Sequence, residues 1–128
     1  MNRKAKGTNA ERELVHMMWA KGWSAARIAG SGSSKYPSPD VVAGNSARRL
    51  AIECKTCREN TKYLTKKEVD ELKEFAHNFG AEPWIGVRFG KDWYFVSPDD
   101  AKHTEKGVVV SVELVKNKGL IIDELLGL

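Results

Sequence analysis

Asp40, Glu53 and Lys55 combine residue types that can hydrolyse a phosphodiester bond. Glu53 and Lys55 are two positions apart in a stretch that reads as a strand, so both side chains should point to the same face. If a hairpin turns between Ser46 and Ala47, Asp40 pairs with Glu53, and directly opposed residues have Cβ atoms about 4.5–5.5 Å apart. The spacing therefore predicts two adjacent carboxylates with an ammonium beside them.

Two adjacent carboxylates repel each other unless a positive charge lies between them. A hard divalent cation such as Mg²⁺ fills this role well, because it prefers oxygen ligands and keeps several waters. Such a metal acidifies water and neutralises charge on a phosphate, and a neighbouring lysine can orient or activate that water. We therefore expect a magnesium site, in which Mn²⁺ could substitute. The alternative is that Glu53 and Lys55 are surface residues of an edge strand.

Glu11 is the fourth candidate, and it should arrive from a helix. Residues 8–11 read as a capping box beginning at Thr8, and Gly22 reads as the stop of the same helix. Glu11 lies three and four positions before Leu14 and Val15, so it shares the apolar face of the helix. We expect its carboxylate to reach the cleft, although a residue that only completes the cap would also fit.

The remaining elements should hold these side chains in place. A hydroxyl-rich loop at 30–34 precedes two prolines at 37 and 39, and a second capping box, Thr65 to Glu68, opens a helix that ends at Gly80. Leu64 and Val69 should form a hydrophobic staple there. Strands are expected at 23–28, 40–43, 49–55, 84–89, 93–96 and 108–110, a short helical turn at 97–98, and a terminal helix at 120–126.

This order predicts an α/β (α+β) fold in a single domain spanning residues 1–128. A central mixed β-sheet should be flanked by helices, with the order α-β-β-β-α-β-β-β-α. The apolar face of the second helix should comprise Val69, Leu72, Ala76 and Phe79.

Charge is divided unevenly along the chain. Residues 1–67 hold 14 Lys and Arg against 5 Asp and Glu, a net charge of +9, whereas residues 68–128 hold 7 against 12, a net charge of −5. One basic face against a polyanion is the favoured interpretation, and an accidental split is the alternative. No apolar run approaches the ~18 residues of a membrane span, so we expect an intracellular, cytoplasmic protein.

The two cysteines do not predict a metal or redox site. Cys54 and Cys57 form a C-x-x-C, but a zinc site needs four ligands and the three histidines are scattered singly. Cys54 falls in a strand rather than at a helix start, where a thiolate would be stabilised. We expect its side chain to join Leu50 and Ile52 on the core face, and Cys57 to be incidental.

Several of these motifs together resemble one family. In order and spacing, the chain resembles the archaeal Holliday junction resolvases, members of the restriction-endonuclease-like PD-(D/E)xK nuclease superfamily, from its basic start to about Val96. The motifs that carry the resemblance are Glu11 within residues 7–14, Arg27, Gly-Ser-Gly-Ser at 30–33, Pro39-Asp40, Ile-Glu-Cys-Lys at 52–55, and Phe-Ala-His-Asn-Phe-Gly at 75–80.

The resemblance implies roles for individual residues. Asp40 and Glu53 would bind the metal, with the Cys54 carbonyl as a candidate third ligand, and Lys55 would orient or activate the attacking water. Glu11 would complete the metal site directly or through water. Ser31 would be the loop serine tied to catalysis, although Ser33 and Ser34 stand close enough to replace it. DNA phosphates would be held by Arg3, Lys4, Lys6, Arg12, Arg27 and Lys35.

The resemblance also implies partners. It predicts a nucleoid-associated homodimer without an organic cofactor that nicks two opposing strands of four-way junction DNA, with a basic arm at residues 1–7. The apolar segment 108–128 contains a cluster formed by Leu120, Ile121, Ile122, Leu125 and Leu126. This cluster is too apolar to stay exposed, so it either lies at the dimer interface or closes the chain's own core. Trp84 and Trp93 are also interface or core candidates, with the core favoured.

Two other functions remain open at this level. A related nuclease of the same superfamily could cut duplex DNA or act in repair, and an inactive relative could only bind DNA. The intact set of Glu11, Asp40, Glu53 and Lys55 argues against the inactive relative. The chain has no segment long enough for a separate base-reading domain, which favours recognition of DNA shape over sequence.

Overall fold

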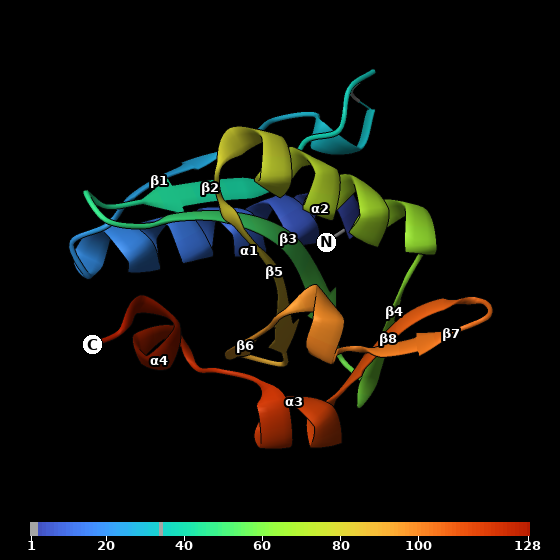
Figure 1. The fold of residues 1–128 in the computed structure, drawn as a ribbon. Helices are drawn as coiled ribbons and strands as arrows, with labels where there is room; N and C mark the ends of the chain where they lie inside the picture. Colours follow the sequence, from blue (N-terminus) through green and yellow to red (C-terminus); the bar gives the residue numbers. More distant parts are fainter. Residues whose placement is uncertain (1–2, 34) are drawn as a thin grey trace.

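The fold is a mixed α/β arrangement built around one central sheet, as expected. The computed structural model describes residues 3–33 and 35–128. Its elements, shown in Figure 1, are α1 (Arg3–Ala20), β1 (Ser24–Arg27), the 3-10 turn η1 (Ser31–Ser33), β2 (Val41–Gly44), β3 (Arg49–Cys57), β4 (Thr61–Leu64), α2 (Lys66–Phe79), β5 (Glu82–Phe89), β6 (Asp92–Val96), the 3-10 turn η2 (Pro98–Asp100), β7 (Lys102–Thr104), β8 (Gly107–Ser111), α3 (Val112–Lys118) and α4 (Ile122–Leu126).

The central sheet has five strands in the order β1-β2-β3-β5-β6. Strands β3 and β5 run parallel, and the other neighbours are antiparallel. Because successive strand residues alternate between faces, Leu50 and Ile52 pack in one apolar cluster with residues of α1 and α4, whereas Ala51 packs in a second cluster with residues of α2 and β8. The sheet therefore separates α1 from α2 (Figure 1).

The β2–β3 hairpin has the register that the sequence predicts. Ala43 pairs with Leu50, and Val41 pairs with Ile52. The turn is held by the side chain of Asn45, whose Oδ1 accepts hydrogen bonds from the backbone N–H groups of Ala47, at 2.9 Å, and Arg48, at 2.7 Å. A rigid turn of this length leaves one pairing in which the apolar residues of β3 stay buried.

Helix α2 begins and ends as predicted. Thr65 and Glu68 form the capping box, and Gly80 ends the helix in the left-handed region at φ 77°. Leu64 and Val69 are buried in the same cluster, as a staple requires. The prediction that Phe79 faces the core was wrong, because its ring is 53% exposed. Phe79 lies at the edge of the apolar stripe, stacked on the ring of Phe75, with 5.1 Å between the ring centroids.

Helix α1 starts earlier than the sequence pattern indicates. It begins at Arg3, so Thr8 and Glu11 lie inside the helix and the predicted capping box is absent. Lysine, arginine and alanine favour helix, and they carry it through the basic start as far as Thr8. The Thr8 hydroxyl instead accepts a hydrogen bond from Arg27 Nη2 at 3.4 Å. Residues 3–7 of the predicted basic arm are therefore helical.

A second, three-stranded sheet has the order β4-β8-β7 and was only partly predicted. Strand β8 contains the expected apolar run, but β4 and β7 are short and largely polar, so no alternating pattern marks them. They exist because β8 pairs with both. Helix α3 was also missed, although the Ser111 hydroxyl caps it by accepting from the N–H of Leu114 at 3.1 Å.

The C-terminal apolar cluster mostly closes the chain's own core. Leu125 and Leu126 are buried in the α1-side cluster, which also contains Trp93, whereas Ile121 is 49% exposed. Leu120 pairs with Phe95 outside any helix, so the terminal helix is shorter than predicted. Within the described residues, no helix is both long and apolar enough to cross a bilayer.

Candidate active site

The two predicted carboxylates meet at the open end of the β2–β3 hairpin. Asp40 directly precedes β2, in which Val41 pairs with Ile52, and the Asp40 N–H donates to the carbonyl of Ile52 at 3.1 Å, which places Asp40 beside the Ile52–Glu53 stretch of β3. Burial, followed by the negative charge of Asp40, raises the pKa of Glu53 to about 8, and the two side chains share a hydrogen bond. The pair therefore binds one proton where a cation could take its place.

Asp40 is held by both of its oxygens. The hydroxyl of Ser31 donates to Oδ1 at 2.7 Å, and the backbone N–H of Cys54 donates to Oδ2 at 2.8 Å. Ser33 instead donates to the carbonyl of Gly30 at 3.2 Å. Of the two described loop serines, Ser31 is thus the one that contacts the site, and Ser34 lies outside the described residues.

The side chain and the backbone N–H of Cys54 have different partners. The side chain lies on the core face of the sheet, as the strand pattern predicts, and packs against the apolar cluster that contains Leu50 and Ile52. Burial in that cluster, with the nearby carboxylates, raises the pKa of the thiol well above its usual range. Its backbone N–H serves Asp40, so the residue contributes to the site through its main chain.

Glu11 reaches the site from α1 and is paired there. Arg27 Nε donates to Glu11 Oε1 at 3.0 Å, and the two side chains are 25% and 15% exposed. Burial and the charge of Asp40 raise the pKa of Glu11 despite the opposing effect of Arg27. The structure therefore brings Glu11 within electrostatic range of Asp40, but Arg27 contacts it directly.

Lys55 is also paired. Its ammonium donates to Oε2 of Glu68 at the start of α2. Burial lowers the pKa of Lys55, but Glu68, Glu53 and Asp40 outweigh this effect and raise it, so the lysine is charged. Sequence analysis missed Glu68 as a site residue. The signal was present, because a capping box that directly follows the strand of Lys55 places an acidic side chain near the end of that strand.

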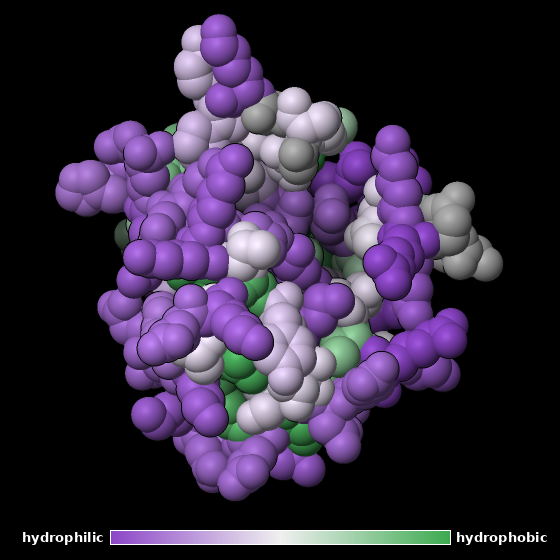
Figure 2. Space-filling model, turned by 90° about the vertical axis from the view of Figure 1, so that its right-hand side faces the viewer, coloured by the Kyte–Doolittle hydropathy of each residue, from purple (hydrophilic) through white to green (hydrophobic). Residues whose placement is uncertain are grey.

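The basic residues predicted to contact DNA lie on α1, on β1, which ends at Arg27, and in the loop after η1. Lys35, in the loop after η1, is exposed, with its Nζ 5.9 Å from the centroid of the Tyr36 ring. Figure 2 shows one face of the molecule covered mainly by hydrophilic side chains, with hydrophobic ones in the recesses between them. The α1 residues are Arg3, Lys4 and Arg12, which are exposed, and Lys6, which is half-buried.

The described part of the chain does not form a ready-made metal cage. Across residues 3–33 and 35–128, no three Asp, Glu, His or Cys side chains converge as metal ligands. Hydrogen bonds to Arg27, Ser31 and Cys54 occupy carboxylate oxygens of Glu11 and Asp40. The donor chemistry nevertheless fits a hard divalent cation, because the available groups are carboxylates and two of them share a proton.

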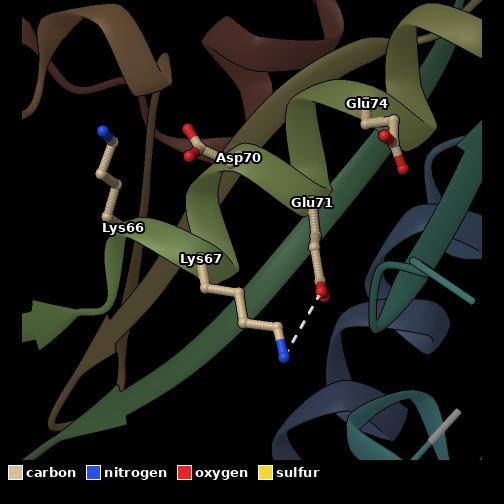
Figure 3. Close-up of a pocket in the computed structure, with 5 residues that line it drawn as sticks. All are labelled: Lys66, Lys67, Asp70, Glu71 and Glu74. Atoms are coloured by element: carbon tan, nitrogen blue, oxygen red, sulfur yellow. Dashed lines mark ion pairs between the residues drawn. The ribbon is translucent and has the colours of Figure 1, made fainter. Parts of the chain in front are cut away.

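One surface hollow lies elsewhere on the molecule. It has a volume of about 370 Å³ and lies on the outer face of α2 (Figure 3). Its lining consists of Lys66, Lys67, Asp70, Glu71 and Glu74 and includes neither Asp40 nor Glu53. We therefore place the candidate site at the hairpin, where half-buried and mutually repelling acids meet.

Comparison with known proteins agrees with the resemblance seen in the sequence. A relative from Archaeoglobus fulgidus, named crossover junction endodeoxyribonuclease Hjc, is 42% identical over 125 residues, covering 97% of this chain and 91% of the relative. A protein of the same name from Sulfolobus acidocaldarius is 36% identical, covering 98% and 89%. Crossover junction endodeoxyribonuclease Hje from Saccharolobus islandicus is 37% identical, covering 84% and 79%.

The fold also matches that of a relative whose structure has been solved. The solved structure of Archaeoglobus fulgidus Hjc, described as a Holliday junction resolvase, superposes with a TM-score of 0.87 at 38% identity, covering 93% of this chain and 98% of that one. The model of the family "Archaeal holliday junction resolvase (hjc)" matches residues 2–128. This chain therefore belongs to the archaeal Holliday junction resolvase (Hjc) family.

Proposed function

We propose that this chain is a structure-specific DNA endonuclease that resolves four-way (Holliday) junctions. The observation that carries the proposal is the half-buried Asp40–Glu53 pair, with Lys55 two residues away on the same strand face. Relatives similar over almost the whole chain are named crossover junction endodeoxyribonucleases, which supports both the reaction and the substrate.

The reaction depends on a divalent cation, Mg²⁺, for which Mn²⁺ can substitute. Asp40, Glu53 and the backbone carbonyl of Cys54 would hold it, with Glu11 completing the site directly or through water. The oxygen-only donor set and the shared proton of the two acids support this choice. When bound, the cation supplies Lewis acidity toward the phosphate and lowers the pKa of nearby water.

The chain's own side chains supply orientation and proton transfer. Lys55 is a charged donor beside Glu53, so its ammonium orients the attacking water or helps to activate it. Ser31 fixes one oxygen of Asp40 and thereby sets the direction of the other. Glu11 adds a carboxylate from α1, which Arg27 orients through Oε1.

The basic side chains of α1, of β1 and of the loop after η1 bind the DNA backbone. The exposure of Arg3, Lys4, Arg12 and Lys35 and the +9 charge of residues 1–67 support this assignment. Each phosphate contact releases counterions, so affinity should fall steeply with salt. The residues are Arg3, Lys4, Lys6, Arg12, Arg27 and Lys35.

The working form is a homodimer of single-domain subunits. A four-way junction offers two equivalent strands, and a twofold dimer presents two equivalent sites to them. Because Leu125 and Leu126 close the chain's own core, the 108–128 segment can contribute only its exposed side chains, such as Ile121. Light scattering at assay concentration should give the mass of two chains, and a one-chain mass would contradict the dimer.

One cleavage assay tests the whole proposal. A mobile four-way junction and linear duplexes of the same sequences are incubated with the protein in Mg²⁺, in Mn²⁺ and in EDTA. We expect paired nicks in the junction with either metal, intact duplex, and no cleavage in EDTA. Equal cleavage of duplex would favour a duplex or repair nuclease, and junction binding without cleavage would favour an inactive DNA-binding relative.

A further inference from the structure

The contact between Lys55 and Glu68 joins the catalytic strand to a helix. Lys55 lies on β3, Glu68 lies in the first turn of α2, and the ammonium donates to Glu68 Oε2. The two side chains are 25% and 30% exposed, so the contact is partly shielded from water. Lys55 also lies within electrostatic range of Glu53 and Asp40.

The carboxylate of Glu68 is fixed without any help from the lysine. Its Oε1 accepts from the backbone N–H of Thr65 at 2.9 Å and from the Thr65 hydroxyl at 3.2 Å. The Thr65 Oγ1 in turn accepts from the N–H of Glu68 at 3.0 Å. The second oxygen, Oε2, is therefore a rigid acceptor presented by the start of α2.

The choice of glutamate over glutamine follows from what surrounds it. In a capping box either residue satisfies the helix, because a single acceptor oxygen is enough. Here donors lie on both sides, the Thr65 N–H and the Lys55 ammonium, and an amide has one acceptor oxygen and a donor NH₂ group. Only a carboxylate satisfies both, so the second oxygen is explained by Lys55.

A lysine that acts on water needs such an anchor. Its four-carbon stem is flexible and its ammonium has three rotatable donors, so a free lysine samples many positions. Catalytic groups work when a supporting residue restricts them to a narrow geometry. A capped carboxylate at a helix start supplies that restriction.

We propose that Glu68 is a positioning residue that holds the Lys55 ammonium beside the Asp40–Glu53 pair for the hydrolytic step. The inference rests on the proposed function of Lys55. It predicts that Glu68 affects the cleavage rate, through Lys55, and leaves junction binding alone.

The test is a double-mutant cycle in single-turnover cleavage of a four-way junction in Mg²⁺, with enzyme in excess. We expect Glu68→Gln to cleave about tenfold more slowly or worse, since losing a supporting partner typically costs 10–100-fold. The dissociation constant for the junction should stay within about twofold, because Glu68 is not a phosphate contact. In a Lys55→Ala background, Glu68→Gln should change the rate no further.

Two variants serve as controls. Glu71→Gln removes the same charge one turn along α2, where Glu71 pairs with Lys67 at 3.9 Å (Figure 3), and it should cleave like wild type. Thr65→Ala removes the hydroxyl half of the same cap but keeps the Glu68 carboxylate. Its melting temperature should fall further than that of Glu68→Gln, which keeps an acceptor for the cap, whereas its cleavage rate should stay closer to wild type.

The outcomes separate this inference from the proposed function. Wild-type cleavage by Glu68→Gln, faster cleavage, or a further loss in the Lys55→Ala background would overturn the positioning role. If Thr65→Ala slowed cleavage as much as Glu68→Gln, the loss would belong to the cap, and the inference would also fall. Failure of the proposed function looks different: wild type would leave the junction intact, or Lys55→Ala would cleave like wild type, and the inference would fall with it.

Discussion

Two ion pairs of similar burial lie on opposite sides of the site, and they do different things. On the α1 side, Arg27 contacts Glu11, and on the α2 side, Glu68 contacts Lys55. Arg27 Nε contacts one oxygen of Glu11, Oε1, so in the proposed mechanism this pair orients a carboxylate that can complete the cation site. Glu68 leaves the Lys55 ammonium charged and restrained, so in the same mechanism that pair orients the group that acts on water. A salt bridge at an active site can therefore restrain either an acid that binds the cation or a basic residue that acts on water.

The largest effect on cleavage is expected at Asp40 and Glu53, which lie between the two ion pairs. Asp40→Asn or Glu53→Gln should reduce junction cleavage in Mg²⁺ by about a thousandfold or more, because metal-assisted charge stabilisation is worth several kcal/mol. Junction affinity should stay near wild type or increase, because the basic side chains supply most of it. Filter binding and single-turnover cleavage measure the two quantities. Full activity of either variant would remove these residues from the site.

The next largest effect on the cleavage rate is expected on the α1 side of the site, at Glu11. Glu11→Gln should slow cleavage by about 100-fold, the upper range for loss of a supporting metal contact, while melting changes by only a few degrees. Arg27→Met breaks the same pair but leaves the carboxylate. It should weaken junction binding and reduce the salt slope by about one. If Glu11→Gln is fully active, Glu11 has only a structural role.

The hairpin and the second helix could be predicted from sequence because their signals are local. The Asp40–Glu53 register follows from alternation and turn length, and Thr65 and Glu68 are a capping box at the correct spacing. The same four-residue pattern misled at Thr8, because upstream residues also favour helix and Thr8 bonds Arg27 instead. A local motif is therefore reliable only where its flanking residues agree with it.

Long-range relations could not be predicted in this way. Strands β4 and β7 form because β8 lies between them, and nothing in their own residues requires it. The pairing of Lys55 with Glu68 spans 13 residues and two elements, and the pairing of Glu11 with Arg27 spans 16. The selection of Ser31 over Ser33 depends on how the loop turns back to Asp40.

Loss of the serine hydroxyl that contacts Asp40 should have a smaller effect on the cleavage rate, and a second serine in the same loop supplies the control. Ser31→Ala removes the hydroxyl that orients Asp40, and it should slow cleavage by about tenfold, the lower range for such a contact. Ser33→Ala, two residues away, removes a hydroxyl that bonds Gly30 and should leave the rate unchanged. Equal rates for the two variants, whether both fast or both slow, would remove the distinction between the serines.

The last effect concerns pH and stability in metal-free buffer, and it is measured on folding rather than on cleavage. The pKa of Glu53 is about 8 in the folded chain and near 4.5 when unfolded, so between these values the folded state keeps a proton that the unfolded state has lost. That stabilisation is fully present below pH 4.5 and is lost as pH rises toward 8, with a slope of at most about 1.4 kcal/mol per pH unit.

Urea unfolding in EDTA between pH 5 and pH 8 measures this slope, with Glu53→Gln as the matched variant. The variant should show a shallower decline, because its side chain does not titrate. Glu68 and Glu82, whose pKa values are lowered, act only at more acidic pH and stay outside this window. A wild-type curve as flat as that of Glu53→Gln would contradict the buried acid pair.

The central claim is that the hairpin acids bind the cation, and Mn²⁺ binding tests it most directly. Mn²⁺ titrated into wild-type protein, with and without a four-way junction, is followed by electron paramagnetic resonance of the free ion. We expect binding that strengthens with DNA, disappears in the double variant Asp40→Asn/Glu53→Gln, and persists in Glu68→Gln, which leaves both acids in place. Unchanged Mn²⁺ binding by the double variant would show that the cation site lies elsewhere.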